Sequence, residues 1–459
     1  MSAKNVTMTE GSLGKKILLF SLPLMLSNIL QILFTMADVA VVGRFAGSLA
    51  LGSVGSTTTL IMLFIGFLIG VGSGINVIVA RFCGARDQKS AQETIHTAAI
   101  LSLLIGLAVM GIGELLARPL LELLGTKSDL IDGATVYLRI YFLGLPALAV
   151  FNFGNAVLSA VGDTKRPLLY LSLSGVLNVV LNLVFVIAFD MSVRGVALAS
   201  IIAQYVSAVL VVICLLRSHG IYELRLKRLH FYPDKAMRLL ALGIPAGFQN
   251  AIFHIANLFI QAGVNTFDTT MVAGNSAAAN ADGLVYDVMA AFYTACSSFM
   301  SQNYGAGKRE RILKSYFISL AYSFAAGAIL GGLLVLFGRP FLSLFAADEA
   351  VIEAGLTRLT IMGLTYCVSA FMDATIAAAR GIGKSLWPTV MVIMGSCVFR
   401  VIWVYTVFAH FGTIQSLYLL YVFSWSITAL AEIAYFAYCY KRQMRLFDHT
   451  NPAPIPQEA

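Results

Sequence analysis

The chain has 459 residues, of which 59% are hydrophobic and only 12% are charged, and its formal net charge is +8. An ordinary soluble domain carries about 25% charged residues, so this composition excludes a soluble globular enzyme or binding domain. Apolar runs long enough to cross about 30 Å of hydrocarbon recur from end to end. They are too long and continuous for barrel strands, and backbone groups in lipid must bond internally. The sequence therefore predicts an all-α integral membrane protein.

Twelve segments are apolar and long enough to span a membrane as helices. They are residues 17–43, 51–79, 94–115, 133–160, 167–189, 193–216, 236–265, 272–300, 315–337, 355–380, 388–411 and 415–440. The connections on one side, together with both ends of the chain, hold 23 Lys and Arg residues, Arg380 among them; the opposite loops hold six, including Arg358. The positive-inside rule places the basic side in the cytoplasm. We therefore expect a multi-pass protein of the bacterial inner membrane with both termini cytoplasmic, and no nucleic-acid partner.

The two halves of the chain are copies of each other. The stretch "RPLLELLGT" at Arg118 matches "RPFLSLFAA" at Arg339, and Gly162 aligns with Gly383 at the same offset along the chain. Each half holds six predicted spans, an even number, so the repeat is parallel. We predict an N-lobe at 1–216 with helices 1–6, a cytoplasmic linker at 217–235, a C-lobe at 236–440 with helices 7–12, and a cytoplasmic tail at 441–459. Two such bundles are typical of transporters that work by alternating access.

The first span carries a polar stripe inside an otherwise apolar helix. Its residues are Asn28, Gln31, Thr35 and Asp38, at spacings of three, four and three, which place them on one helical face. A carboxylate in hydrocarbon costs several kcal/mol unless it is paired, hydrated or protonated. An ionised Asp38 would hold a cation and a protonated one would release it. We interpret Asp38 as the centre of a coupling-ion site; the alternative is a helix-end residue reaching the outer surface.

Two asparagines lie four residues apart in the fifth span, so they share a helical face. Asn178 and Asn182 could hydrogen-bond a carboxylate or offer amide oxygens to Na⁺. The alternative is that they bond neighbouring helices together, which is common for Asn in membranes. We find no metal-binding cluster beyond this possible Na⁺ site, and no P-loop, HExxH or GxSxG motif that would require a cofactor.

The second half offers its own polar residues for a substrate cavity. His254 and Asn257 lie on the polar face of the seventh span, the counterpart of the first-span stripe. Asp282, Asp287 and Asp373 are candidate cavity acids, or else members of internal ion pairs. Arg139 and Arg400 are the only arginines assigned to spans, so they are the expected partners.

The chain resembles the multidrug and toxic compound extrusion (MATE) family of secondary transporters. The resemblance rests on "SLPLMLSNILQILFTMADVAVVGRFAG", "YLRIYFLGLP", "NAVLSAVGDTKRPL", "LNVVLNLVF", "GNSAAANADGLVY", "FMDATIAAARGIGKSLWP" and "VFRVIWV", in this order. It implies a V-shaped, two-lobed bundle of twelve helices. It also implies that Asp38 is the first-helix carboxylate and Tyr137 the fourth-helix tyrosine. The fifth helix departs from the family's Asn-x-x-x-Asp, because Asn182 replaces the carboxylate, and His254 replaces a glutamate found in one branch.

The sequence as a whole predicts a monomeric secondary antiporter in membrane lipid. We expect it to export amphipathic, cationic small molecules in exchange for H⁺ or Na⁺. The predicted coupling-ion residues are Asp38, Tyr137, Asn178 and Asn182, and the predicted cavity residues are Asn28, Gln31, Thr35, His254, Asn257, Asp282, Asp287 and Asp373. A lipid-linked saccharide flippase of related architecture is the first alternative, although it would need several basic residues in its cleft. An integral-membrane enzyme is the second, and it would need clustered His or acidic residues at one interface.

Overall fold

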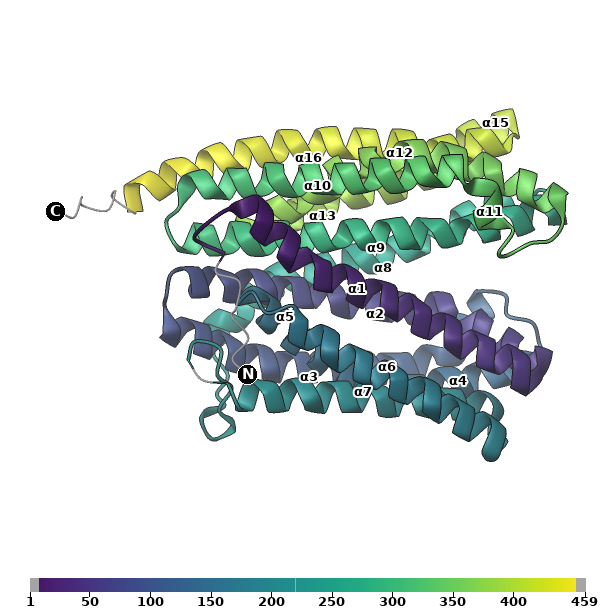
Figure 1. Cartoon of the computed structure of the whole chain (residues 1–459), viewed down its shortest axis with the longest axis horizontal. Coiled ribbons are helices and arrows are strands. Elements are labelled where there is room, and N and C mark those ends of the chain that lie inside the picture. The colour runs from purple at the N-terminus through teal and green to yellow at the C-terminus, as the bar shows by residue number, and fades with distance from the viewer. Residues whose placement is uncertain (1–7, 219, 451–459) are drawn as a thin grey trace. The chain divides into compact units, whose positions relative to one another are not determined.

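A computed structural model describes residues 8–218 and 220–450, and every regular element in these ranges is a helix (Figure 1). The helices of the first half are α1 (Leu13–Val41), α2 (Gly47–Gly84), α3 (Gln88–Leu123), α4 (Ile131–Phe142), α5 (Leu145–Ala160), α6 (Lys165–Leu183) and α7 (Ser192–Leu216). Two π-helical turns join them, η1 (Val42–Ala46) after α1 and η2 (Val184–Ala188) after α6.

The second half repeats the order of the long helices. Together with several short ones, its helices are α8 (Pro233–Val264), α9 (Thr269–Gly305), α10 (Arg309–Leu336), α11 (Gly338–Leu342), α12 (Glu349–Gly381), α13 (Leu386–Val392), α14 (Phe399–Trp403), α15 (Ala409–Phe411) and α16 (Ile414–Thr450). The π-turns η4 (Ile393–Val398) and η5 (Val404–Phe408) join α13, α14 and α15 into one helical span, and the 3₁₀ turn η3 (Leu226–Arg228) lies between α7 and α8.

Nine helical stretches of the described residues are long and apolar enough to cross a membrane, or ten if α4 and α5, which meet at a 46° bend, form one span. One of these stretches, Leu13–Gly84, holds both α1 and α2, which are separated at Gly47. The long helix α9 is not among them because polar residues such as Asn275 and Asp282 lower its hydropathy. With α1, α2 and α9 each taken as a span, the twelve predicted membrane helices are confirmed.

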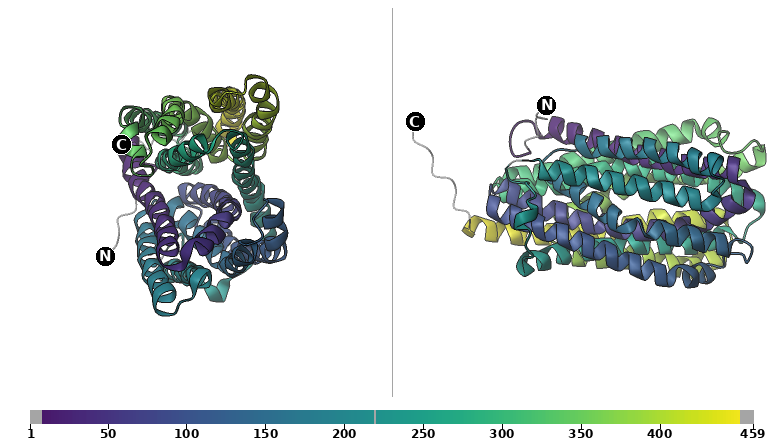
Figure 2. Two further views of the ribbon diagram at one scale, coloured as in Figure 1. Left: turned by 90° about the vertical axis from the view of Figure 1, so that its right-hand side faces the viewer. Right: turned by 90° about the horizontal axis from the view of Figure 1, so that it is seen from below.

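The described residues form two compact units. Unit 1 holds residues 19–79 and 87–255, and unit 2 holds residues 8–18, 80–86 and those from 256 onward. In unit 1, α3 packs on α4 and α5, and α7 packs on α4, α5 and α6. In unit 2, α12 packs on α9, α10 and α16, which Figure 2 shows running alongside it. The lobe boundaries drawn from the sequence stay a prediction.

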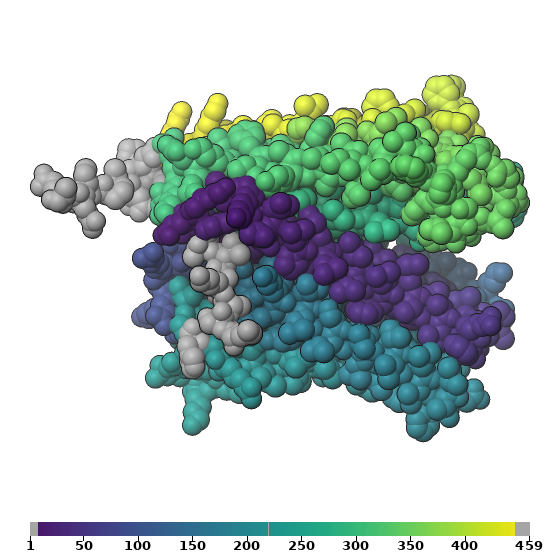
Figure 3. Space-filling model, viewed as in Figure 1, coloured from purple at the N-terminus to yellow at the C-terminus, as the bar shows by residue number. Residues whose placement is uncertain are grey.

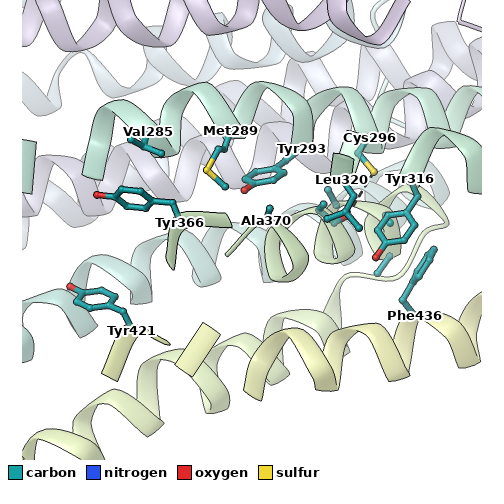
Figure 4. Packing of buried hydrophobic residues seen from close by; sticks show 14 of the residues in the cluster. Val285, Met289, Tyr293, Cys296, Tyr316, Leu320, Tyr366, Ala370, Tyr421 and Phe436 are labelled. Atoms are coloured by element: carbon teal, nitrogen blue, oxygen red, sulfur yellow. Dashed lines mark hydrogen bonds between the residues drawn. The ribbon is translucent and has the colours of Figure 1, made fainter. Parts of the chain in front are cut away.

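Apolar residues sort by their surroundings in both units. On α1, which lies on the surface in Figure 3, Leu22, Leu26 and Leu33 are about half exposed, as expected for side chains that face lipid. In unit 2, Met289 and Tyr293 of α9 lie opposite Tyr366 of α12 and Tyr421 of α16 in a buried cluster (Figure 4). Three of these four core residues are tyrosines, so the interior of unit 2 is partly polar.

The repeat extends to the backbone of one turn. Gly162 and Gly383, which the sequence aligns, both have φ of 89°. In each turn the N–H of the following residue bonds at 2.9 Å to the carbonyl five residues back. This pattern ends a helix with a left-handed residue, for which glycine is favoured. The predicted alignment therefore holds at the level of backbone conformation.

Acidic residues cap three of the long helices. Asp87 accepts a hydrogen bond from Ser90 N at 3.0 Å and starts α3, and this bond lowers the pKa of the Asp87 carboxyl. Asp268 starts α9 and Asp348 starts α12 in the same way. Each cap satisfies a backbone N–H that the first helical turn leaves without a partner.

A stripe of glycines brings two helices of unit 1 into backbone contact. Gly70 and Gly74 of α2 face Gly247 and Gly243 of α8. A Cβ added at Gly70 would lie 2.4 Å from the backbone nitrogen of Gly247, and one at Gly74 would lie 2.6 Å from that of Gly243. Small residues at such crossings let membrane helices approach closely and gain van der Waals contact. This crossing fixes the start of α8 against α2.

We expect Gly70→Ala to lower the free energy of unfolding by about 1–3 kcal/mol, because the new methyl group would overlap the α8 backbone. Thermal unfolding of the purified protein in detergent would measure this. Gly55→Ala in the same helix is the matched control, since a Cβ there meets open space. Equal melting temperatures for the two variants would contradict the close crossing.

Candidate functional site

Asp38 lies half-buried near the end of α1, where α6 and α7 approach it. Asn182 Nδ2 donates to Asp38 Oδ1 at 2.5 Å, and Ser200 Oγ donates to Asp38 Oδ2 at 3.5 Å. Both carboxylate oxygens therefore have a neutral donor from another helix. Such donors stabilise a charge that hydrocarbon would otherwise exclude.

The two asparagines of α6 form the second layer of this site. Asn182 Nδ2 also donates to Asn178 Oδ1 at 3.3 Å, and Asn178 Nδ2 donates to Ser200 Oγ at 3.4 Å. Asn182 Oδ1 is buried and accepts no hydrogen bond from the described residues. A buried acceptor without a donor is costly, and it is a suitable ligand for a hard cation. The Asn182 atom that faces Asp38 is the nitrogen, so a cation site made by the oxygens of both residues stays a prediction.

Tyr137 of α4 lies at the same site. Its ring is buried and stacks on that of Tyr141, with centroids 6.1 Å apart. The negative charge of Asp38 acts on both hydroxyls. Hydrogen bonds therefore connect three of the four residues predicted for the coupling ion, Asp38, Asn178 and Asn182, and add Ser200, whereas the part of Tyr137 stays a prediction.

Ser200 was not predicted from the sequence. Serine in a membrane helix usually bonds its own backbone, so a single serine in α7 gives no signal by itself. Two π-turns give a further structural signal: η1 begins four residues after Asp38, and η2 begins two residues after Asn182. Such turns are frequent at functional sites because they shift side chains out of the regular helical register.

The polar stripe of α1 does not extend the hydrogen-bonded cluster around Asp38. Thr35 donates to the carbonyl of Gln31 in its own helix at 3.0 Å, and both side chains are exposed. Asn28 is half-buried. Their part in a substrate cavity stays a prediction.

A buried ion pair organises unit 2. Arg358 of α12 pairs with Asp282 of α9 and is only 6% exposed. Its assignment to an outer loop was wrong, because α12 begins nine residues earlier, at Glu349, and carries Arg358 inward. Of the three acids for which Arg139 and Arg400 were possible partners, Asp282 pairs with Arg358 instead.

A hydrogen-bonded network surrounds this pair. Arg358 Nη1 donates to Asn275 Oδ1 at 2.7 Å, and the Tyr418 hydroxyl donates to the same oxygen at 3.0 Å. The Tyr366 hydroxyl donates to Asp282, and Asn275 Nδ2 donates to Gln261 of α8 at 3.3 Å. Asp282 is thus held by two donors, which favours the structural alternative for this acid over a free cavity ligand.

The other two predicted acids lie deeper in unit 2. Asp373 of α12 is half-buried, and the charges of Arg380 and Arg400 act on it. Asp287 of α9 is also half-buried, and both its charge and that of Asp373 act on Tyr286. Arg380 lies in the last turn of α12 and not in a loop. The statement that spans hold only two arginines was therefore wrong, because Arg358 and Arg380 were counted with the loops although the predicted span 355–380 contains both.

The two predicted residues of α8 belong to different surroundings. His254 is half-buried, and a Cβ added at Gly66 of α2 would lie 3.3 Å from its Nε2. Asn257 is exposed, and its Oδ1 accepts from Arg400 Nη1 at 3.4 Å. The described residues contain no group of three or more His, Cys, Asp or Glu that could hold a metal. Any cation at Asp38 would therefore be held by one carboxylate with amide and hydroxyl oxygens.

The fold and this buried polar site match a known family. A family model described as MatE matches residues 23–184 and again residues 245–406, more than half of the chain. The chain belongs to the MatE family, and the model matches it once in each half, as the internal repeat predicts. Because the relatives are transporters, the chain is a multi-pass membrane transporter and not an enzyme.

Two curated relatives differ in what their names say they carry. A probable multidrug resistance protein, YpnP, of Bacillus subtilis (strain 168) is 28% identical over 347 residues, covering 76% of this chain and 78% of the relative. An FAD transporter of Shewanella oneidensis is 25% identical over 349 residues, covering 74% of this chain and 76% of the relative. Relatives that are similarly close to this chain are therefore named for different cargo.

A solved structure shares the fold. It is a MOP superfamily transporter from Pyrococcus furiosus, and its description reports a binding pocket of reverse polarity. The TM-score is 0.89 at 23% identity, and the match covers 97% of this chain and 99% of that chain. The predicted architecture of two repeated six-helix halves is confirmed.

We expect Arg358→Met to lower the free energy of unfolding by roughly 3–5 kcal/mol, because Asp282 would keep a charge without its partner. The double variant Arg358→Met, Asp282→Leu should recover most of that loss, since it removes both charges. Thermal unfolding in detergent would compare the three proteins. A double variant less stable than the single one would contradict the pairing.

Proposed function

We propose that the protein is a secondary active antiporter that exports amphipathic, cationic drugs or toxic compounds in exchange for H⁺ or Na⁺. Transport would proceed by alternating access between an N-lobe at 1–216 and a C-lobe at 236–440, joined by the linker 217–235 and followed by the tail 441–459. The observation that carries the proposal is the carboxylate of Asp38, bonded to Asn182 and Ser200 inside a membrane helix bundle. Such a group is the expected mark of an ion pathway.

Proton coupling would use Asp38 as the exchanging group. When the carboxylate is ionised, its two oxygens hold a positive charge. A proton arriving from outside would neutralise Asp38, end the attraction and release that charge, and loss of the proton to the cytoplasm would reset the site. The hydrogen bonds from Asn182 and Ser200 favour the ionised form, so they set how readily the proton is held.

Sodium coupling would use the same residues differently. Na⁺ would replace the proton at the Asp38 carboxylate, and the Asn182 amide, whose Nδ2 now bonds Asp38, would turn to offer its Oδ1, which accepts no hydrogen bond from the described part of the chain. The Tyr137 hydroxyl and the Asn178 Oδ1 are further oxygens at this site. The replacement of the family's second carboxylate by Asn182 lowers the negative charge of the site, which favours a monovalent ion.

The remaining parts of the proposal rest on composition and family. The excess of Lys and Arg on one side supports an inner-membrane protein with both termini cytoplasmic. The multidrug resistance relative supports a small-molecule cargo. We further propose that the protein acts as a monomer in membrane lipid, with Asn28, Gln31, Thr35, His254 and Asn257 lining the path of the cargo.

The flippase alternative draws some support from the arginines of unit 2. Arg358, Arg380 and Arg400 all lie within helices of unit 2, more than the sequence led us to expect. Arg358 is neutralised by Asp282, and the charges of Glu432 and Asp373 act on Arg380. A pyrophosphate needs several basic groups at one place, so export of smaller amphipathic compounds remains the better-supported function.

We expect Asp38→Asn to abolish gradient-driven efflux while leaving the amount of folded protein unchanged, because the amide cannot exchange a proton and carries no negative charge to attract a cation. Efflux of a fluorescent organic cation from proteoliposomes, under separately imposed H⁺ and Na⁺ gradients, would measure this. Asp129→Asn, in an exposed loop, is the control and should transport like wild type. Full efflux by Asp38→Asn would contradict the coupling role.

We expect Asp373→Asn and Asp287→Asn to weaken export of cationic cargo several-fold, because each removes a negative charge from the interior of unit 2. The readout is the initial rate of efflux for a cationic dye compared with a neutral one of similar size. If neither variant changes the ratio of the two rates, these acids serve the structure alone.

A further inference from the structure

The linker between α7 and α8 is bound to α3 of unit 1 at two places. The N–H of Arg225 donates to His96 Nε2 at 3.2 Å, and the N–H of Tyr232 donates to Thr97 Oγ1 at 3.1 Å. His96 and Thr97 are neighbours in α3, so the chain leaves this helix and returns to it within residues 225–231. We call these residues the linker arch, and both of its ends are fixed.

Large apolar side chains of the linker arch lie on the surface of unit 1. Every residue of the arch is exposed, including Leu226 at 61%, Leu229 at 40% and Phe231 at 39%. The N–H of Leu229 bonds to the carbonyl of Leu226 at 3.2 Å, and residues three apart in such a 3₁₀ turn lie on the same side. Adjacent exposed apolar side chains of this size indicate an interaction surface.

Two cations of the linker arch have no charged partner. Lys227 and Arg228 are exposed, and neither makes an ion pair with any residue that the structure describes. Arg225, by contrast, is paired with Glu223 at 2.8 Å. The arch therefore offers two uncompensated positive charges beside three apolar side chains. This combination is typical of segments that bind the surface of an anionic membrane.

The linker arch is attached at the level where the apolar part of α3 begins. His96 lies eight residues after Gln88, the first residue of α3, which is about 12 Å along the helix at about 1.5 Å per residue. It also lies within the predicted span 94–115. Figure 1 shows this loop, in teal, beside the end of α7. A surface loop at this height is within reach of the lipid headgroups, which extend beyond the hydrocarbon on each side of a membrane.

We propose that the linker arch docks on anionic phospholipids of the membrane that holds the protein. Lys227 and Arg228 would bind the headgroup phosphates, and the three apolar side chains would enter the boundary between headgroups and acyl chains. The two bonds to α3 fix the arch before it binds, so little conformational entropy is lost on docking. The proposal adds a lipid partner to the protein and does not depend on the proposed ion coupling.

Hydrogen–deuterium exchange of the full-length protein in lipid nanodiscs tests this docking. Exchange of the peptide that covers residues 225–231 is compared between discs of phosphatidylcholine alone and discs that also contain phosphatidylglycerol. We expect the anionic lipid to slow exchange of the arch about threefold or more, because bound lipid shields its amides from water. Raised salt should remove most of this slowing, since it screens charges at an exposed surface. Equal exchange in the two kinds of disc at low salt would overturn the proposal.

Paired substitutions assign the effect to the linker arch. The double variant Lys227→Gln, Arg228→Gln should lose the slowing by phosphatidylglycerol, and it should fold because both side chains are exposed. The double variant Lys441→Gln, Arg442→Gln is the matched control, since it removes two exposed charges from α16 and leaves the arch intact. Thermal unfolding in detergent checks that both variants are folded. Slowing that survives in the arch variant, or that is lost equally in the control, would contradict the assignment.

Two further measurements separate a lipid from a soluble anion. Inorganic phosphate added to phosphatidylcholine discs supplies the anion without acyl chains, and we expect it to leave exchange of the arch unchanged. Slowing by phosphate alone would identify a site for a soluble anion and overturn lipid docking. The double variant Leu226→Ser, Leu229→Ser should show weaker slowing by phosphatidylglycerol, because it keeps the two charges and loses apolar contact with the lipid. Undiminished slowing in this variant would overturn the insertion of the apolar side chains.

Discussion

The constraint that organises this protein is that a charge inside hydrocarbon must have a partner. Asp38 finds neutral donors on two other helices, and Asp282 finds Arg358 and Tyr366. Each of these contacts joins two helices. Apolar packing alone would leave these helices free to slide, because lipid tails are as apolar as the side chains of a neighbouring helix. The polar interiors therefore give each unit its register as well as its chemistry. Close crossings such as that of Gly70 with Gly247 add contact area where no charge is present.

The two units stabilise buried charges of different sign. Unit 1 keeps a single carboxylate within reach of amide and hydroxyl groups, an arrangement that can exchange one small cation for another. Unit 2 keeps guanidinium groups on a tyrosine ring and neutralises them in part with acids on neighbouring helices. The family relationship fixes the fold, whereas the polar residues inside the two units differ.

Much of this was predictable, and the failures have physical causes. The spacing of Asn178 and Asn182 and the position of Asp38 in an apolar run predicted their partnership, because a helix converts sequence spacing into direction. Ser200 escaped notice since a single hydroxyl is common in membrane helices. Arg358 and Arg380 lie near the ends of the predicted span 355–380 and were counted with the flanking loops, whereas α12 runs past both of them. Near the end of a membrane helix, a long basic side chain can turn toward the protein interior. Its position in the sequence does not reveal this direction.

The matching turns at Gly162 and Gly383 carry a consequence for the origin of the molecule. Two turns with the same φ and the same hydrogen bond, one in each half of the chain, are best explained by duplication of an ancestral gene that encoded six helices. Such a half-length ancestor would have worked as a symmetric dimer, with the same buried charge in both copies. Fusion freed each copy to mutate alone. The different polar residues of the two halves are therefore a record of divergence after duplication.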